Sequence, residues 1–371
     1  MKNKMLRYIS LSFSGLLFLI LTGLMIPTLP FFGETGTLLE SFFALHLFLG
    51  SIFFGWLSYW SFKKSAVRTA KIAVLLSLIN IVGFSVPIIA LTQTARKYHT
   101  DISWLKVQME MGSPDLLKSV KYATADGKDL YMDVSKPSFV KGNNKLKPVI
   151  LVHGGGFVSG TRNQEPAWTK FFNDRGYIVF DVDYRLANKN YPTWNKAAAD
   201  IASAIVWMGD HASVYNLDMD KLIIAGSSAG GALALQVAYG IHQPCLVVAV
   251  YPAADISALW KENSGFYGIT SRAMCEEYIG GSPQQFPAAY AAVDVSNKLS
   301  AQYPATLLIV GEEDHLIPFK LQKDFADKIN RAGITNEFVA LPFTDHFFTI
   351  ASGSLGSQIA FKVTSDFLDK K

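Results

Sequence analysis

The stretch Gly226-Ser227-Ser228-Ala229-Gly230 matches the pattern G-x-S-x-G and decides the fold of this 371-residue chain. The apolar run 221–225 before it is typical of a buried strand, and the run 231–238 after it is typical of a helix. A strand, a tight turn and a helix in this order hold a serine in a sharp elbow, with its hydroxyl exposed above the sheet. Gly226 and Gly230 let the helix pack close to the strand. The pattern predicts Ser228 as a nucleophile.

Strand-like runs alternate with helical ones from about residue 117 onward. This alternation predicts an α/β fold: a mostly parallel sheet with helices on both faces, whose functional sites form at the carboxyl ends of the strands. A hairpin over 119–134 is expected to turn at Asp126-Gly127. The other expected strands are 149–152, 177–182, 222–225, 246–250, 306–310 and 336–341, and the expected helices include 195–209 and 319–332.

A glycine run, His153-Gly154-Gly155-Gly156, follows the expected strand 149–152. Glycines bring bare backbone N–H groups close to a substrate oxygen, and each fixed donor there contributes ~3–4 kcal/mol to stabilising a developing oxyanion. We expect the oxyanion hole to consist of the N–H groups of Gly155, Gly156 and Ala229, the residue after the nucleophile. His153 is expected to shape this loop rather than to transfer protons, and Gly154 supports the same turn.

An activated serine needs a base, and His346 fits this role because it lies after the last expected strand and before a terminal helix. The acid should lie between the serine and the histidine in the chain, where it holds the histidine tautomer and stabilises the imidazolium. Asp314, just beyond the strand 306–310, is the leading candidate. The rival acids are Glu312, Glu313 and Asp345.

Three apolar stretches, at about 6–30, 38–60 and 72–91, are near or above the ~20 residues that a membrane-spanning helix needs. They account for the mean hydropathy of +0.22, which is high for a soluble enzyme. Seven Lys and Arg residues lie before the first stretch or between the second and third, and only Arg96 and Lys97 oppose them. The positive-inside rule then predicts a cytoplasmic N-terminus and an extracytoplasmic catalytic domain. Asn80 is expected to bond between helices or to lie at an interface.

The domain organisation expected is a membrane region at 1–95, a linker at 96–116 with a break at Gly112-Ser113-Pro114, and a catalytic domain at 117–371. The net charge of +4 comes without a long basic run, so nucleic-acid binding has little support. Two cysteines, Cys245 and Cys275, show no metal-ligand spacing, and Cys245 is expected to be a buried free thiol. No metal and no cofactor are expected.

These motifs, together with Asp183-Tyr184-Arg185-Leu186, resemble the α/β-hydrolase superfamily from about Val120 to the C-terminus. More narrowly, they are similar to carboxylesterases of the hormone-sensitive-lipase-like and acetyl- and feruloyl-esterase-like groups. The resemblance implies hydrolysis of small or short-chain carboxylic esters without a cofactor. Two departures favour the esterase-like group: Ser227 stands where the lipase-like pattern has Asp, and Asn188-Lys189 stands where it has Pro-Glu.

Several functions remain compatible with the motifs. The first is a membrane-anchored serine carboxylesterase acting on a small-molecule ester or lipid, with the bilayer as its other partner. A lipase, a peptidase or amidase, and an acyltransferase would use the same residues, and a non-catalytic membrane scaffold is the alternative outside enzymes. The region 255–299, which holds Trp260 and Tyr278, is either a cap over the substrate or an ordinary helical excursion.

Overall fold

The computed structural model describes residues 2–107, 116–137, 144–241 and 245–370, and these fall into two compact units. The helical unit comprises Met1–Glu110, Gly311–Glu313 and Leu341–Val363. The sheet unit comprises Met111–Val310, Asp314–Ala340 and Thr364–Lys371. The predicted break at Gly112-Ser113-Pro114 lies outside the described residues.

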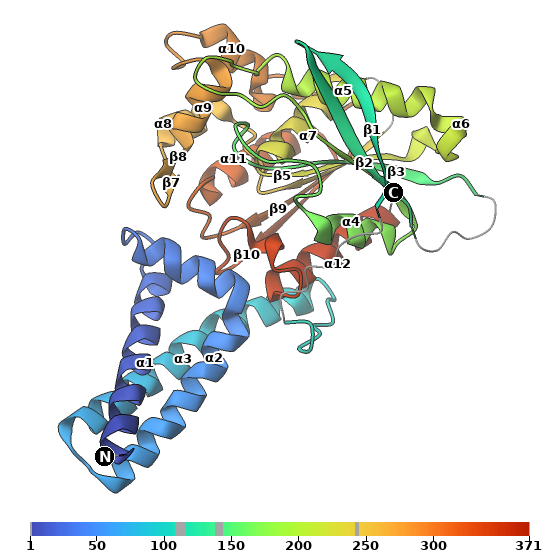
Figure 1. Ribbon diagram of the computed structural model, residues 1–371. Helices are drawn as coiled ribbons and strands as arrows, with labels where there is room; N and C mark the ends of the chain where they lie inside the picture. The colour runs from blue at the N-terminus through green and yellow to red at the C-terminus, as the bar shows by residue number, and fades with distance from the viewer. Residues whose placement is uncertain (1, 108–115, 138–143, 242–244, 371) are drawn as a thin grey trace. The chain divides into compact units, whose positions relative to one another are not determined.

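Three long helices lie side by side in the helical unit (Figure 1). They are α1 (Lys2–Met25), α2 (Phe32–Lys64) and α3 (Arg68–Lys97), and each is long and apolar enough to cross a membrane. The first ends before the predicted limit of residue 30, because the chain continues into Pro27 and Pro30, which cannot extend a helix. The other two run past the predicted stretches at both ends.

Many of the buried side chains of the three helices are small or polar, although a cluster of large apolar ones is buried too, and many large apolar side chains face outward. Asn80 of α3 is fully buried and donates from Nδ2 to the backbone oxygen of Ser14 on α1 at 2.9 Å, which confirms the expected bond between helices. The hydroxyls of Ser14 and Ser77 lie 2.8 Å apart. In contrast, Trp56 and Val82 are 61% and 66% exposed. Close packing through small residues is how helices associate in lipid.

The later segments of the helical unit pack on these helices. Phe343 lies against an apolar cluster of α1 and α3, formed by Leu17, Leu21, Leu24 and Phe84. After Phe343 the chain continues through a 3₁₀ turn, η3 (Phe348–Ile350), into α12 (Leu355–Asp369). Gln358 of α12 accepts from the backbone N–H of Ser103 at 2.8 Å, so α12 has a polar contact with the residues that follow α3.

An eight-stranded sheet has the order β1-β2-β4-β3-β5-β6-β9-β10. The hairpin of β1 and β2 and the pairing of β2 with β4 are antiparallel, and the pairs from β4 through β9 are parallel. The predicted strands are confirmed with ends shifted by at most three residues, and the hairpin turns at the predicted Asp126-Gly127. The strands are β1 (Leu116–Ala125), β2 (Lys128–Ser135), β3 (Lys147–Val152), β4 (Tyr177–Val182), β5 (Leu222–Ser227), β6 (Cys245–Val250), β9 (Thr306–Gly311) and β10 (Asn336–Leu341).

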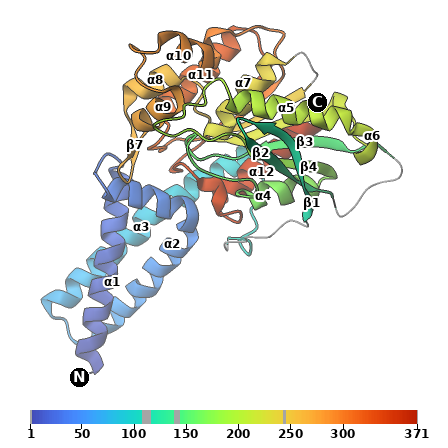
Figure 2. The same cartoon turned by 45° about the horizontal axis from the view of Figure 1, so that its top comes forward.

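Helices cover both faces of this sheet. Figures 1 and 2 show α5 (Ala197–Asp210) and α7 (Ala229–Gly240) on one face and α4 (Pro166–Asn173) on the other. The central strands are buried throughout, as expected for strands covered on both sides. Cys245, at the start of β6, corrects the prediction of a buried thiol: it is only half-buried, because its strand begins at the rim of the sheet, and both cysteines are free.

Between β6 and β9 the chain makes a helical excursion, visible as the orange group in Figure 1. It starts at Asp255, whose side chain accepts from the N–H of Ala258 and so caps the first helix. Its elements are α8 (Ile256–Glu262), the short pair β7 (Gly265–Phe266) and β8 (Ile269–Thr270), α9 (Ser271–Ile279), α10 (Pro287–Val293) and η2 (Val295–Asn297).

Candidate active site

Ser228 occupies a strained turn between β5 and α7. Its φ of 56° and ψ of −122° lie outside the regions that ordinary side chains favour. Its N–H donates to the carbonyl of Val250 on the neighbouring strand at 2.9 Å, which helps to hold this conformation. A Cβ on Gly226 would lie 2.5 Å from the carbonyl oxygen of Gly230, so the elbow requires glycine on both sides of the serine. Strain of this kind is concentrated at functional sites.

The glycine loop lies directly beside the elbow. Strand β3 pairs in parallel with β5, with Val152 opposite Gly226, so both strands end at the same edge of the sheet. A Cβ built on Gly154 would lie 3.4 Å from Cβ of Ser228. The next two residues, Gly155 and Gly156, have φ of 118° and 61°. Within the described residues, the N–H groups of Gly155 and Gly156 donate to no protein acceptor.

His153 supports this loop and is not placed as a proton carrier. Its Nδ1 lies 2.7 Å from the carbonyl oxygen of Gly154, and its ring stacks on Tyr184 at a centroid distance of 4.4 Å. The Tyr184 hydroxyl donates to the His153 carbonyl at 3.0 Å. Burial lowers the pKa of the imidazole, which favours a neutral ring. The loop-shaping role of His153 stays a prediction.

The rest of the motif Asp183-Tyr184-Arg185-Leu186 is structural. The Arg185 guanidinium donates to Asp200 on α5 at 2.6 and 2.9 Å and to Asp126 in the hairpin turn at 2.8 Å. Hydrogen bonds from Tyr191 and Arg185 lower the pKa of the exposed Asp126 carboxyl to about 2. One arginine thereby connects the strand end, a helix and the hairpin that surround the glycine loop.

Ser227, which departs from the lipase-like pattern, has a partner that the sequence did not reveal. Its hydroxyl donates to Oε2 of Glu165 at 2.7 Å. Glu165 immediately precedes α4 and lies 62 residues earlier in the chain. No local sequence signature connects the two positions, so this support beneath the elbow emerged only from the fold.

Asp314 follows β9, as predicted, and is buried in the sheet unit with 5% of its surface exposed. Its Oδ1 accepts from the backbone N–H groups of Leu316 and Ile317 at 2.9 and 2.7 Å. Its Oδ2 accepts from Nε2 of Gln322 at 3.2 Å. These three donors fix the orientation of the Asp314 carboxyl group.

His346 belongs to the helical unit and is fully buried there. It lies in the predicted place, on the loop between β10 and α12. The rival acids Glu312, Glu313 and Asp345 belong to the same unit. The N–H of Glu313 donates to the Thr344 carbonyl at 3.0 Å, which ties the loop after β9 to the histidine loop. The structure therefore brings Ser228, the glycine loop and Asp314 into one unit and places His346 in the other.

The excursion between β6 and β9 contacts the glycine loop. A Cβ on Gly156 would lie 2.3 Å from Sδ of Met274 on α9. The rings of Phe157 and Tyr278 stack at a centroid distance of 3.9 Å. Tyr278 is fully buried in this contact. The position of α9 therefore limits the space over the loop.

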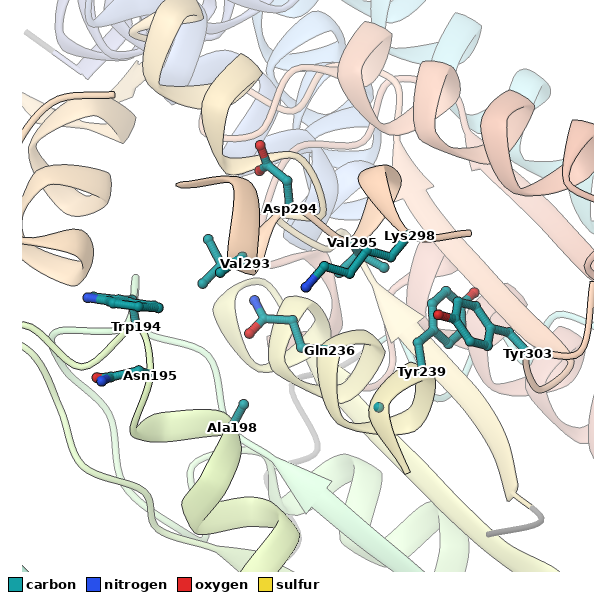
Figure 3. Close-up of a pocket in the computed structure, with 12 residues that line it drawn as sticks. Trp194, Asn195, Ala198, Gln236, Tyr239, Val293, Asp294, Val295, Lys298 and Tyr303 are labelled. Carbon is teal, nitrogen blue, oxygen red and sulfur yellow. The ribbon is translucent and has the colours of Figure 1, made fainter. Parts of the chain in front are cut away.

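A pocket of about 310 Å³ lies elsewhere, at the far end of α7 (Figure 3). Gln236 and Tyr239 line it from α7. Trp194, which lies before α5, and Lys298, which follows η2, also line it. With a rise of about 1.5 Å per residue, Gln236 lies roughly 12 Å along the helix from Ser228. This pocket is therefore separate from the elbow. Among the described residues, no group of three or more His, Cys, Asp or Glu side chains is placed to hold a metal ion.

Solved structures share this sheet. Esterase 2 of Thermogutta terrifontis aligns with a TM-score of 0.57 at 23% sequence identity, covering 70% of this chain and 96% of that one. At this identity the likeness establishes the fold, which is the predicted α/β-hydrolase fold.

Curated relatives give the same picture at the level of sequence. Esterase LipQ of Mycobacterium tuberculosis is 23% identical over 253 residues, which cover 65% of this chain and 59% of that protein. The ethyl acetate hydrolase of Pseudomonas putida is 25% identical over 250 residues, covering 63% of this chain and 76% of the relative. The chain thus spans about three-fifths of LipQ. The BD-FAE family matches residues 132–329, more than half of the chain, and together with the shared sheet this shows that the chain belongs to the BD-FAE family and has an α/β-hydrolase fold.

Proposed function

We propose that this chain is a membrane-anchored serine carboxylesterase in which Ser228 is the nucleophile, His346 the general base and Asp314 the acid that orients the histidine. The observation that carries the proposal is the strained elbow of Ser228 beside a glycine loop in which, among the residues that the structure describes, the N–H groups of Gly155 and Gly156 donate to no acceptor. Family membership and the esterase relatives support the choice of ester substrates.

The reaction proceeds in two halves. His346 takes the hydroxyl proton of Ser228 as the oxygen attacks the ester carbonyl, and it then gives the proton to the leaving alcohol. Water, activated by the same histidine, next releases the acid from the acyl-enzyme. The N–H groups of Gly155, Gly156 and Ala229 stabilise the negative charge on the carbonyl oxygen in both halves. Ala229 is the first residue of α7, where backbone N–H groups have no carbonyl partner one turn earlier in the helix.

Small or short-chain esters are the proposed substrates. The contact of Met274 with Gly156 and the stacked rings of Phe157 and Tyr278 leave limited room over the glycine loop. One relative is described as an ethyl acetate hydrolase, which agrees with a small acyl group. A lipase, an amidase or peptidase, and an acyltransferase remain the alternatives. They differ from the proposal in the acyl-chain length, in the bond cleaved and in the acyl acceptor, respectively.

The three long helices are proposed to span a membrane, with the N-terminus in the cytoplasm and the catalytic domain on the other side. Their outward side chains are large and apolar, and the basic residues follow the positive-inside pattern. Reporter fusions test the orientation. A periplasmic-type reporter should be active after residue 30, between α1 and α2, and a cytoplasmic-type reporter after residue 66, between α2 and α3. The reverse pattern would overturn the orientation.

Hydrolysis of p-nitrophenyl esters from acetyl to long acyl chains tests the enzymatic proposal. Ser228→Ala should keep the fold and lose activity by a factor on the order of 10⁶, because the nucleophile is gone. Ser227→Ala is the matched control, since its hydroxyl points to Glu165 and should affect turnover only modestly. Retained turnover in Ser228→Ala would refute the nucleophile, and a folded wild-type protein inactive on every ester would favour the amidase or acyltransferase alternatives.

A further inference from the structure

We propose that Thr37 and Ser41 of helix α2 are positioning residues for the loop that carries His346. The apolar helices would then take part in the reaction in addition to holding the chain at a membrane. This inference rests on the proposed function, because it concerns the residue that acts there as the general base.

Asp345, the residue before His346, is held by α2 through two hydrogen bonds. Oγ1 of Thr37 donates to Oδ2 of Asp345 at 2.6 Å, and the backbone N–H of Asp345 donates to Oγ of Ser41 at 2.8 Å. The second carboxylate oxygen, Oδ1, accepts from the backbone N–H of His346 at 2.7 Å. A continuous path of hydrogen bonds therefore runs from the helix to the histidine backbone.

The geometry of α2 prepares both hydroxyls for this contact. Thr37 and Ser41 are four residues apart, so they lie on the same face of the helix. The Ser41 hydroxyl donates to the Thr37 carbonyl at 2.8 Å, which leaves the Ser41 oxygen free to accept from Asp345. Thr37 has a single hydroxyl hydrogen, and the carboxylate at 2.6 Å attracts it more strongly than the Gly33 carbonyl at 3.0 Å.

Because these hydrogen bonds are buried, the loss of one should move the loop that carries His346. Thr37, Asp345 and His346 have no exposed surface, and Ser41 has 5%. Water therefore has no access to replace a lost partner, and a buried carboxylate that loses a donor must be accommodated by movement of its loop. Phe343 fixes the same loop from its apolar side by packing on the cluster of Leu17, Leu21, Leu24 and Phe84.

The consequence for catalysis is positional. General-base catalysis depends on hydrogen-bond reach, and a misplacement of about 1 Å costs as much as 10²-fold in rate. Relaxing the Asp345 contact should therefore lower kcat while leaving ester binding, and with it KM, nearly unchanged. A purely structural weakening of the helices would not produce this separation.

The test uses the full chain in detergent micelles with a p-nitrophenyl ester. Thr37→Val keeps the side-chain shape and removes the hydroxyl, and kcat should fall by about 10- to 100-fold with KM within about twofold. Thr37→Ser retains the hydroxyl and should restore most of the wild-type kcat. The matched control is Ser51→Ala, because Ser51 is equally buried on α2 but donates only to the Leu47 carbonyl of its own helix.

The outcomes separate this inference from the proposed function. If Ser228→Ala and His346→Ala are inactive but Thr37→Val has the wild-type kcat, the positioning role is wrong and the proposed function stands. Turnover that persists in His346→Ala would instead refute the proposed base and the positioning role with it. An equal loss in Thr37→Val, Thr37→Ser and Ser51→Ala would also overturn the positioning role. If Thr37→Val does not fold, Ser41→Ala carries the test, with the same expected fall in kcat.

Discussion

At the scale of single residues, Arg185 is the side chain whose loss should be felt most widely in the sheet unit. It is 10% exposed and pairs with Asp200, which is 4% exposed. Removing one partner of a buried pair leaves the other charge uncompensated and costs about 3–5 kcal/mol. Arg185→Met should therefore lower the free energy of unfolding by that amount in denaturant titrations.

The matched control for this prediction is the pair of Lys170 with Asp174 on α4. It has the same type of charges at 2.8 Å, but both side chains are about half exposed. Lys170→Met should cost less than about 1 kcal/mol, because water screens the pair. Equal losses in the two variants would mean that burial of the Arg185 pair does not matter.

Residues also differ in how well their structural role could be predicted from the sequence. The elbow at Ser228 and the glycine loop could be predicted, because their backbone geometry demands glycines at fixed local spacing. The partner of Ser227 could not, since Glu165 is remote in sequence and its role depends on how α4 packs. The link between Thr37 and Asp345 is the extreme case, because the two residues are 308 positions apart and have no pattern in common.

At the scale of elements, the attachment of α8 depends on Asp294. This carboxylate accepts from the N–H groups of Ile256 and Ser257 at 2.5 and 3.1 Å and from the Ser257 hydroxyl. Burial raises its pKa from 3.8 to about 6, more than the hydrogen bonds from Ser257 lower it. The folded protein therefore binds this proton more tightly than the unfolded chain.

A raised carboxyl pKa fixes the sign of a pH effect. The stabilisation from the bound proton is present below about pH 4 and is lost as the pH rises through about 6. Asp294→Asn has no proton to lose, so the difference in melting temperature between wild type and variant should change between pH 4 and 6 and stay constant from 6.5 to 8. Thermal unfolding in detergent measures it, and a constant difference across the whole range would contradict the raised pKa.

Helix α9 should set the acyl-chain preference of the proposed esterase. Met274 sits against the glycine loop, so Met274→Ala opens space there. We expect the ratio of kcat/KM for octanoyl over acetyl esters to rise about tenfold, since each additional buried methylene is worth ~0.8 kcal/mol. Met274→Leu preserves the volume and should keep the wild-type ratio. An unchanged ratio in Met274→Ala would show that the acyl group binds away from α9.

Elements with a strong local hydrophobic pattern were predictable from the sequence, and elements that depend on packing against distant residues were not. Strand β4 (Tyr177–Val182) has the predicted limits because it is an apolar run, interrupted only by Asp181, that is buried along its whole length. The excursion from Asp255 was expected only as one region, because its short helices have weak periodicity and are held by distant contacts such as Lys328 with Asp255 at 2.8 Å.

At the scale of the whole molecule, the exposed apolar surface is concentrated on α1, α2 and α3. Val82 of α3 is 66% exposed, and Val214 of α6 (Ala212–Tyr215) is 71% exposed. If the three helices face lipid, Val82→Asp should cost about 2.5–3.5 kcal/mol of membrane insertion and release protein from membranes washed with alkaline carbonate. Val214→Asp is the matched control and should leave membrane retention unchanged. Equal retention of both variants would contradict a lipid-facing α3.

The contact between Thr37 and Asp345 also has a meaning for biosynthesis. After Thr37 a ribosome adds 308 residues up to and including Asp345, so α2 is finished long before its partner exists. At about 5–20 residues per second, that interval lasts roughly 15–60 s. During this time the hydroxyls of Thr37 and Ser41 lack their hydrogen bonds to Asp345. An ester-cleaving site of the proposed kind would therefore mature only after nearly all of the described chain has been translated.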